Sequence, residues 1–369
     1  MTVRTGDLEK TAAAFRAGET MYATLGSPLY SAFCRAGADD PEILELSAGG
    51  LDAASAVHLF TSVHYLLLGG IEHPLAGYFA TLTPEPGPPG EAWPQFRDFC
   101  FAHREALAEL IATRPVQMTY AYRCRAVLPP MCVVAAEAGE PLNIIELGCS
   151  AGVMLAFDKY HYEFQHGASA GDPASPIRLA GAIHGGGPAL RIPRIGSRTG
   201  IDLNVIDPAD ANDRRWMIAT CYPELLDDQR QLSDAMDIVA GLGVSFHQGD
   251  ALEHLAGVLA QVPDPVCVYH SACLYYWSDE EKQALERQLI ELSKGREIHR
   301  ISIETTSAAN RWLEGRNEAM DTEGPAARAT GEIIVTRYRD GEARADWLAA
   351  FTPDFGTMWW TGGGQVVDK

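Results

Sequence analysis

The sequence predicts an α/β protein: a doubly wound, mostly parallel sheet with an antiparallel C-terminal edge, preceded by an α-helical N-terminal cap. Three observations support this prediction. From residue 143 onward, apolar runs typical of buried strands alternate with helical segments. The first of these runs ends in a turn bounded by Gly148 and Gly152. Residues 1–130 show helical periodicity and no convincing strand, so we expect a cap at 1–130 and a sheet unit at 131–369.

The cap is expected to consist of amphipathic helices joined by short loops. These helices are predicted at Leu8–Ala17, Pro28–Ala36, Ile43–Leu46, Ala53–Leu68, Phe96–Arg114 and Tyr120–Ala138. The last of them should break at Pro129-Pro130, because proline lacks the backbone donor that a helix interior needs. His64 and Tyr65 could face a pocket and contact a substrate, although a structural role is the alternative.

The sheet unit is expected to contain five strands followed by an antiparallel hairpin. The strands are predicted at 143–147, around 200–204, and at 244–247, 266–270 and 298–304, and the hairpin segments at 332–338, 343–351 and 357–360. Helices should follow at Val153, at Asp228–Val239 and after the capping box Ser278–Glu281. The insertion at 160–191 shows no clear regular structure, which indicates a functional lid or a mobile loop.

Composition limits the class of partner. The 369 residues carry 29 Lys and Arg against 49 Asp and Glu, a formal net charge of −20, which disfavours a nucleic acid partner. Eight dispersed cysteines without metal-ligand spacing predict buried thiols in a reducing cytoplasm rather than a metal site. No window reaches the ~20 apolar residues of a membrane helix. We therefore expect a soluble, cytoplasmic protein with a small-molecule substrate and no membrane partner; its oligomeric state cannot be read from the sequence.

The turn after the first strand is the main candidate site. Glu146 ends the apolar run, and Gly148 and Gly152 let the chain turn tightly and let a ligand approach, because glycine has no Cβ. An ordinary strand–helix turn is the alternative. The E-x-G-x-x-x-G spacing resembles the first motif of class I methyltransferases that use S-adenosylmethionine (SAM). Five strands with this loop after the first, acids after the second and third, and a terminal hairpin also resemble the core of that class.

The same residues also fit a rival pattern. Gly148–Gly152 reads as G-x-S-x-G, the nucleophile elbow of α/β serine hydrolases, with Ser150 as the nucleophile. His184–Gly187 resembles the oxyanion-hole sequence of lipases. In hydrolases, however, several strands and the oxyanion-hole loop precede the elbow, whereas here His184–Gly187 follows it. The hydrolase remains a second alternative.

Motifs along most of the chain are similar to a bacterial family known only as domain of unknown function family 2332. These motifs are Ser27-Pro28-Leu29-Tyr30, His64–Gly69, Glu146-Leu147-Gly148, Ser150-Ala151-Gly152, Asp158-Lys159-Tyr160 with Tyr162, Gly171–Pro176, Gly200–Leu203, Gly249-Asp250 and His270-Ser271-Ala272. The sequence departs from the expected pattern at Cys149, where a plain small residue is usual, and at Val153-Met154. The activity of that family is itself inferred from its methyltransferase-like core.

The methyltransferase resemblance implies SAM as the cofactor, lying across the carboxyl ends of the first three strands. The implied cofactor contacts are Glu146, Gly148, Cys149, Ser150, Gly152, Asp202, Gly249, Asp250 and Ala251. Asp202 would accept from the ribose hydroxyls and Asp250 from the adenine amine. The alternatives are a turn-forming aspartate at Asp202, with Asp207 in its place at the ribose, and a helix N-cap at Asp250.

The residues after the fourth strand would face the methyl acceptor. His270 and Tyr275 are the catalytic candidates, with Tyr276 and Trp277 as substrate contacts that suit a small, partly apolar acceptor. The alternatives are that the aromatic rings pack between sheet and helix and that His270 is tied to a backbone carbonyl. The predicted activity is therefore a SAM-dependent methyltransferase; a non-catalytic SAM-binding or regulatory protein is the first alternative.

Overall fold

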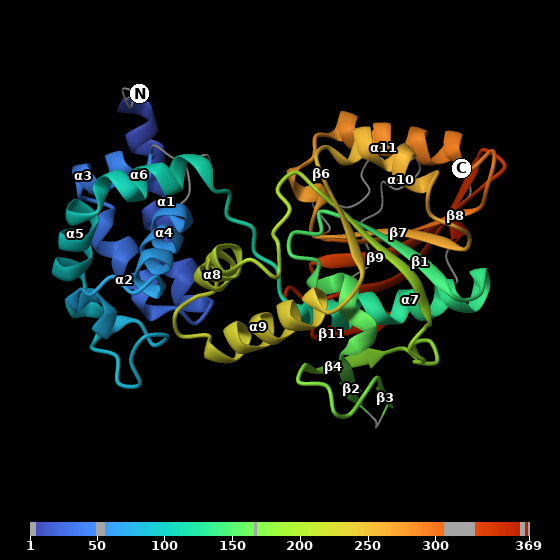
Figure 1. Ribbon diagram of the computed structural model, residues 1–369, viewed down its shortest axis with the longest axis horizontal. Coiled ribbons are helices and arrows are strands. Elements are labelled where there is room, and N and C mark those ends of the chain that lie inside the picture. Colours follow the sequence, from blue (N-terminus) through green and yellow to red (C-terminus); the bar gives the residue numbers. More distant parts are fainter. Residues whose placement is uncertain (1–4, 49–55, 166–167, 306–328, 362–365, 368–369) are drawn as a thin grey trace. The chain divides into compact units, whose positions relative to one another are not determined.

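The computed structural model describes residues 5–48, 56–165, 168–305, 329–361 and 366–367. They form two compact units (Figure 1): Met1–Met118 with Ala209–Ser233, and Thr119–Pro208 with Asp234–Lys369. We call them the helical unit and the sheet unit and describe each by itself.

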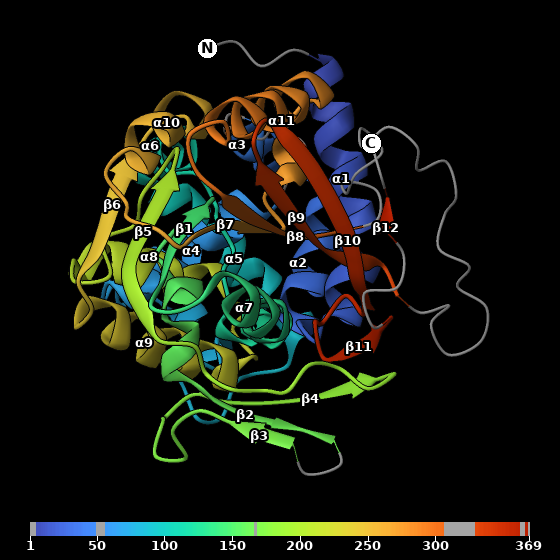
Figure 2. The ribbon, with the colours of Figure 1, turned by 90° about the vertical axis from the view of Figure 1, so that its right-hand side faces the viewer.

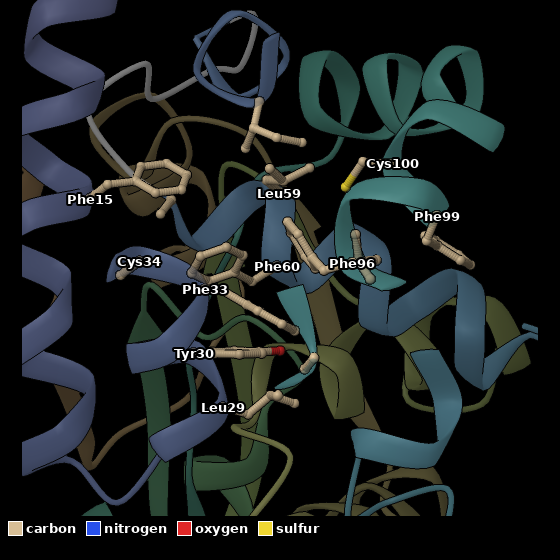
Figure 3. Close-up of a cluster of buried hydrophobic side chains, with 14 of the residues drawn as sticks. Phe15, Leu29, Tyr30, Phe33, Cys34, Leu59, Phe60, Phe96, Phe99 and Cys100 are labelled. Atoms are coloured by element: carbon tan, nitrogen blue, oxygen red, sulfur yellow. The ribbon is translucent and has the colours of Figure 1, made fainter. Parts of the chain in front are cut away.

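The helical unit contains short helices around one aromatic core. Its elements are α1 (Thr5–Thr24), α2 (Pro28–Gly37), α3 (Pro41–Ser47), α4 (Val57–Leu68), η1 (Pro74–Tyr78), η2 (Pro89–Glu91), α5 (Trp93–Ala102), α6 (Arg104–Thr113) and α8 (Ala211–Thr220). Helix α9 (Leu226–Ala240) begins in this unit and ends in the sheet unit. Phe15, Phe33, Phe60 and Phe96 are fully buried in the core, and the rings of Phe33 and Phe96 lie 4.1 Å apart (Figure 3).

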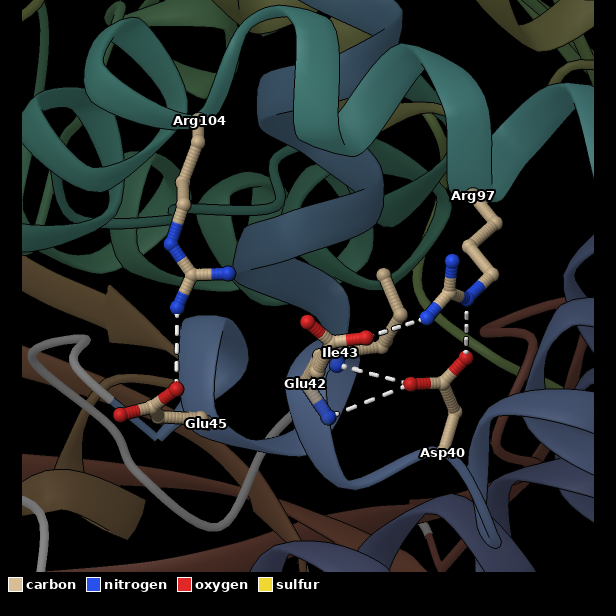
Figure 4. A network of polar contacts seen from close by, with 6 residues as sticks. All are labelled: Asp40, Glu42, Ile43, Glu45, Arg97 and Arg104. Atoms are coloured by element: carbon tan, nitrogen blue, oxygen red, sulfur yellow. Dashed lines mark hydrogen bonds and ion pairs between the residues drawn. The ribbon is translucent and has the colours of Figure 1, made fainter.

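Charged contacts fix helix α3 on the surface of this unit (Figure 4). Asp40 caps α3 through the backbone N–H groups of Glu42 and Ile43 and also accepts from Arg97 Nε at 2.8 Å. Arg97 also pairs with Glu42. The Arg97–Glu42 pair is exposed on both sides and contributes little stability, whereas the Asp40 carboxylate is mostly buried.

Three predictions for the helical segments need correction or a limit. The expected helix Phe96–Arg114 is two helices, because His103 has non-helical backbone angles between α5 and α6. Helix α4 begins at Val57, and residues 53–55 of the predicted segment lie outside the described residues. The expected break at Pro129-Pro130 is wrong: α7 (Cys124–Ala138) runs continuously through both prolines after the short η3 (Ala121–Arg123).

The sheet unit is built on one large sheet with a parallel centre (Figure 2). The central order is β6-β5-β1-β7-β8, with all four neighbouring pairs parallel. These strands are β1 (Leu142–Leu147), β5 (Ile195–Asp202), β6 (Val244–Gln248), β7 (Val266–Ser271) and β8 (Ile298–Thr305). Numbered along the chain, they have the order 3-2-1-4-5 of a doubly wound fold.

The antiparallel edge follows β8. The predicted hairpin is confirmed as β9 (Gly331–Arg339) and β10 (Glu342–Phe351), with β11 (Thr357–Trp360) and β12 (Val366–Val367) both pairing with β10. Helices cover both faces of the sheet. On one face, α10 (Ala251–Leu259) and α11 (Asp279–Leu292) contribute to an apolar core with residues of β1, β5 and β7. Helix α7 packs near β8, β9 and β4 on the other.

The insertion at 160–191 has regular structure, contrary to expectation. It forms β2 (His161–Phe164), β3 (Ala168–Ala170) and β4 (Arg178–His184), and β4 joins the sheet by pairing with β11. The segment expected to start an α-helix at Val153 is a 3-10 helix, η4 (Val153–Lys159). The capping box is confirmed, since Ser278 and Glu281 bond reciprocally at the start of α11.

Candidate functional site

The candidate site lies where the winding direction of the sheet reverses. Strand β1 lies between β5, which follows it along the chain, and β7, which pairs on its other side. In open α/β sheets, ligands bind outside the carboxyl ends of the strands at this switch point. The sequence places most of its candidate residues in the turns that follow these strands.

The turn after β1 requires its glycines. Gly148 and Gly152 have φ of 75° and 71°, and Ser150 between them has φ of 50°. A Cβ at Gly148 would lie 2.6 Å from the sulfur of Cys273, and one at Gly152 would lie 2.9 Å from the ring of Phe246. The absence of a side chain at Gly152 therefore leaves room for the ring of Phe246, whether or not a ligand is bound.

Glu146 lies under this turn as a buried carboxyl group. Its side chain is fully buried, and the hydroxyl of its β7 neighbour Tyr269 donates to Oε2 at 2.9 Å. The other oxygen, Oε1, has no hydrogen-bond partner among the residues that the structure describes. Burial raises the pKa of Glu146 well above its ordinary value of 4.5, and nearby Asp202 raises this pKa further, while Tyr269 and Arg123 oppose the shift. The raised pKa favours the protonated carboxyl, which can donate a hydrogen bond as well as accept one.

Asp202 and Asp250 both have the structural roles that were the alternatives. At the end of β5, Asp202 accepts from the backbone N–H of Ser150 at 2.7 Å and of Asn204 at 2.9 Å, so it holds the glycine turn. Asp250 caps α10 by accepting from the N–H of Leu252 at 2.7 Å. A carboxylate can accept several hydrogen bonds, so these structural roles do not by themselves exclude a ligand contact.

The other cofactor candidates take part in the same turns. Gly249 has φ of 145°, and its N–H donates to the Asp202 carbonyl at 2.8 Å, which ties the end of β6 to β5. Ala251 is the buried first residue of α10. Cys149 is buried, and a Cβ at Gly200 of β5 would lie 2.5 Å from its sulfur. The structure thus brings the turns after β1, β5 and β6 together through backbone contacts.

His270 forms a buried pair with a residue that the sequence did not single out. Its Nδ1 lies 2.7 Å from Oε1 of Glu304 near the end of β8, and both side chains are fully buried. The expected tie to a backbone carbonyl is therefore wrong. Within the described ranges, Nε2 of His270 and Oε2 of Glu304 have no hydrogen-bond partner. Burial lowers the pKa of His270, and Arg300 lowers it further, while Glu304 opposes the shift.

The aromatic residues after β7 are exposed. Tyr275 and Tyr276 in η6 (Leu274–Tyr276) are 67% and 80% exposed, with their rings edge to face at 5.3 Å. Packing between sheet and helix was the alternative, and it is wrong for these two residues. Trp277 is partly buried and packs against the core beneath α10 and α11.

His64 and Tyr65 belong to the interior of the helical unit. Both ring nitrogens of His64 are paired, Nδ1 with the Ala219 carbonyl at 3.2 Å and Nε2 with the Thr81 hydroxyl at 2.9 Å. Burial lowers the pKa of His64 to about 4. Tyr65 accepts from Arg215 at 2.8 Å and is buried. This geometry does not support the predicted substrate contacts, because the side-chain interactions are already made within the unit.

The fold gives little support to the α/β-hydrolase alternative. His184 ends β4, which is separated from β1 in the strand order by β11, β10, β9, β8 and β7. The Ser150 turn is followed by the 3-10 helix η4, whereas a nucleophile elbow opens an α-helix.

The described residues contain neither a candidate membrane span nor a candidate metal site. None of the helices in the described ranges is both long and apolar enough to cross a membrane. Within the same ranges, no group of His, Cys, Asp or Glu is suited to hold a metal ion.

The fold and the site define a doubly wound α/β protein with a glycine turn and buried acids at the switch point of its sheet. The chain belongs to the family described as "Uncharacterized protein conserved in bacteria (DUF2332)", whose model matches residues 12–359. The resemblance inferred from the sequence motifs is thereby confirmed at the level of this family. No curated protein matches the chain.

Proposed function

We propose that the protein is a SAM-dependent methyltransferase that acts on a small, partly apolar acceptor. The support is the convergence of the glycine turn, Asp202 and Asp250 at the carboxyl ends of β1, β5 and β6. A ligand with an amino-acid part, a ribose and an adenine needs hydrogen-bond partners spread over three neighbouring strand ends, and this edge offers them.

One observation carries the proposal: Oε1 of Glu146, two residues before the glycine turn, is buried and has no hydrogen-bond partner in the part of the chain that the structure describes. Leaving such an atom unpaired costs about 1–3 kcal/mol. The cost is removed when a ligand supplies the missing partner. The positive charge of the amino group of a bound methionine moiety would lower the raised pKa of Glu146, and the ionised carboxyl would then accept from that group.

When bound, SAM supplies an electrophilic methyl group on a sulfonium. The chain would hold it through Glu146 and the Gly148–Gly152 turn at the methionine part, Asp202 at the ribose and Asp250 at the adenine. The exposed rings of Tyr275 and Tyr276 suit contact with a partly apolar acceptor.

Calorimetry with SAM and with S-adenosylhomocysteine tests the proposal. Glu146→Gln should weaken binding by about 10–100-fold, because a hydrogen bond worth roughly 1–3 kcal/mol is altered. Glu140→Gln is the matched control. Glu140 lies just before the amino end of β1, bonded to Arg191 and Arg194, and its replacement should leave affinity unchanged. Absence of binding to either compound would refute the proposal.

The alternatives give different results in the same experiments. A non-catalytic SAM-binding protein would bind SAM and release no S-adenosylhomocysteine with any acceptor. A serine hydrolase would react with a fluorophosphonate probe at Ser150, and Ser150→Ala would abolish the labelling.

A further inference from the structure

Glu304 is the hub of the hydrogen bonds at the carboxyl end of β7. Its Oε1 accepts from the backbone N–H of Cys273 at 3.1 Å and of Leu274 at 3.2 Å, and it lies 2.7 Å from Nδ1 of His270. One oxygen therefore holds both the histidine and the start of the loop that carries Tyr275 and Tyr276.

This geometry determines the tautomer of His270. A backbone N–H can only donate, so Oε1 acts as an acceptor toward Cys273 and Leu274. As an ionised carboxyl Glu304 has no proton to give, so Nδ1 of His270 is the donor to this oxygen and carries the ring proton. In the neutral imidazole the lone pair then lies on Nε2.

The atoms left over form a set of hydrogen-bond acceptors. Nε2 of His270 and Oε2 of Glu304 are buried without partners among the described residues, and so is the hydroxyl of Ser302, which is the β8 neighbour of His270. His270 and Ser302 face the same side of the sheet because they are in register, and Glu304 lies two residues beyond Ser302 on that side. Two acceptors and a hydroxyl fit a ligand group that brings its own O–H or N–H.

We propose that His270 is the catalytic base for a hydroxyl- or amine-bearing methyl acceptor and that Glu304 is its positioning residue. The proposal rests on the function proposed above and names the acceptor class for it. Carbon acceptors and thioethers are excluded, because they bring no O–H or N–H to the pair.

The step balances in atoms and charge. The acceptor oxygen or nitrogen forms a bond to the methyl carbon while the S–C bond of the sulfonium breaks, with both electrons left on sulfur. The proton of the acceptor passes to Nε2, which gives an imidazolium beside the Glu304 carboxylate. That carboxylate stabilises the charge formed on the ring.

His270 is fully buried, and the loop from Ala272 to Trp277 follows it directly in the chain, so we expect a shift of this loop to admit the acceptor. The loop begins at Ala272, a non-glycine residue with φ of 50°, which is a conformation of raised energy. Tyr275 and Tyr276 on this loop are exposed and offer apolar surface to an acceptor. Glu304 thus ties the position of the base to that of the substrate loop.

Nuclear magnetic resonance of the full chain with ¹⁵N-labelled histidine tests the tautomer directly. The signals of His270 are assigned by their loss in His270→Gln. We expect a neutral ring with the proton on Nδ1 and a bare Nε2. His299→Gln is the matched control. His299 lies on β8 and is buried like His270, and its replacement should not move the His270 signals. A proton on Nε2 of the wild-type ring would overturn the proposal.

The Glu304→Gln variant separates the positioning of His270 from the support of the loop that begins at Ala272. The amide oxygen can keep all three hydrogen bonds, so the fold should persist, while the negative charge is lost. We expect the titration midpoint of His270 to fall and the release of S-adenosylhomocysteine with hydroxyl and amine acceptors to drop by about 10²-fold. Turnover equal to wild type would overturn the base assignment.

Calorimetry with SAM keeps the two proposals apart. Glu304→Gln should bind SAM as wild type does, because Glu304 lies outside the glycine turn. If the wild-type protein fails to bind SAM, the proposed methyltransferase function is refuted, and the tautomer measurement still decides whether Glu304 positions His270 as a base.

Discussion

The buried carboxyl of Glu146 should make the stability of the protein depend on pH in a way that a glutamine removes. Glutamine is nearly isosteric with a protonated glutamate, and its carbonyl can accept from Tyr269 as Oε2 does. We therefore expect Glu146→Gln to match the wild type in stability near pH 4.5, where both side chains are uncharged in the folded state.

The sign of the effect follows from linkage. The pKa of Glu146 in the folded protein is raised above its ordinary value of 4.5, so above that pH the folded state binds more protons than the unfolded state. The stabilising contribution is complete below pH 4.5 and is lost as the pH rises toward the folded pKa. Each pH unit in this window costs the wild type about 1.4 kcal/mol relative to Glu146→Gln. The difference between the two proteins should therefore grow as the pH rises from 5.5, for as long as the pH stays below the folded pKa.

Urea unfolding at pH 5.5, 6.5 and 7.5 measures this difference. Glu140→Gln serves as the control, because hydrogen bonds from Arg194 and Arg191 outweigh burial and lower the pKa of Glu140. Glu140 is ionised throughout this range, so its variant should keep the pH slope of the wild type. Parallel curves for wild type and Glu146→Gln would show that Glu146 ionises in the folded protein and would refute the reasoning.

Three further predictions concern the turns and the helical unit. Gly152→Val should abolish SAM binding and lower the free energy of unfolding by about 2–4 kcal/mol, because valine is strained at φ 71° and its Cβ meets Phe246; unchanged affinity in calorimetry would contradict the cofactor turn. Asp250→Ala should lower stability by about 1 kcal/mol through loss of the cap on Leu252 and should weaken SAM binding more than Asp250→Asn does; normal affinity would leave Asp250 only a helix cap. The pKa of His64 is lowered from 6.5 to about 4, so its contribution is complete above pH 6.5 and falls by about 3 kcal/mol as the pH drops to 4; His64→Gln should remove this acid sensitivity in urea unfolding, and an unchanged pH dependence would contradict it.

The central strands were predictable because each is a short apolar run with a clear boundary. Val266–His270 is buried along its whole length, as a central parallel strand should be. The capping box at Ser278 marked the start of α11 for a similarly local reason. The strands of the insertion carried no such signal. β4 alternates between exposed and buried residues, and it pairs in parallel with both β2 and β11, partners that no local pattern reveals.

The part of the candidate site formed by the turn after β1 was predictable from the sequence. The part that depends on the pairing of β7 with β8 was not. The glycines at 148 and 152 were identified by spacing alone, and both have positive φ. Glu304 was missed because an acidic residue near the end of a strand is normally expected to face solvent. Its partner is 34 residues away, and only the pairing of β7 with β8 brings the two together. The exposure of Tyr275 and Tyr276 likewise depends on the tertiary fold, so packing against the sheet was an open alternative.

The unpaired atoms at the carboxyl edge have an energetic consequence. Oε1 of Glu146 is on one face of the sheet, and Nε2 of His270 and Oε2 of Glu304 are on the other, because Glu146 is in register with Tyr269 and side chains alternate along a strand. Each unpaired buried polar atom costs about 1–3 kcal/mol, which is large beside the 5–15 kcal/mol that typically stabilises a domain. A cofactor that forms a hydrogen bond with Oε1 of Glu146 would remove part of this free-energy cost. A methyl acceptor that bonds to Nε2 of His270 and Oε2 of Glu304 would remove another part. Two ligands with contacts on opposite faces of the same strand ends are what a group transfer between a cofactor and an acceptor requires.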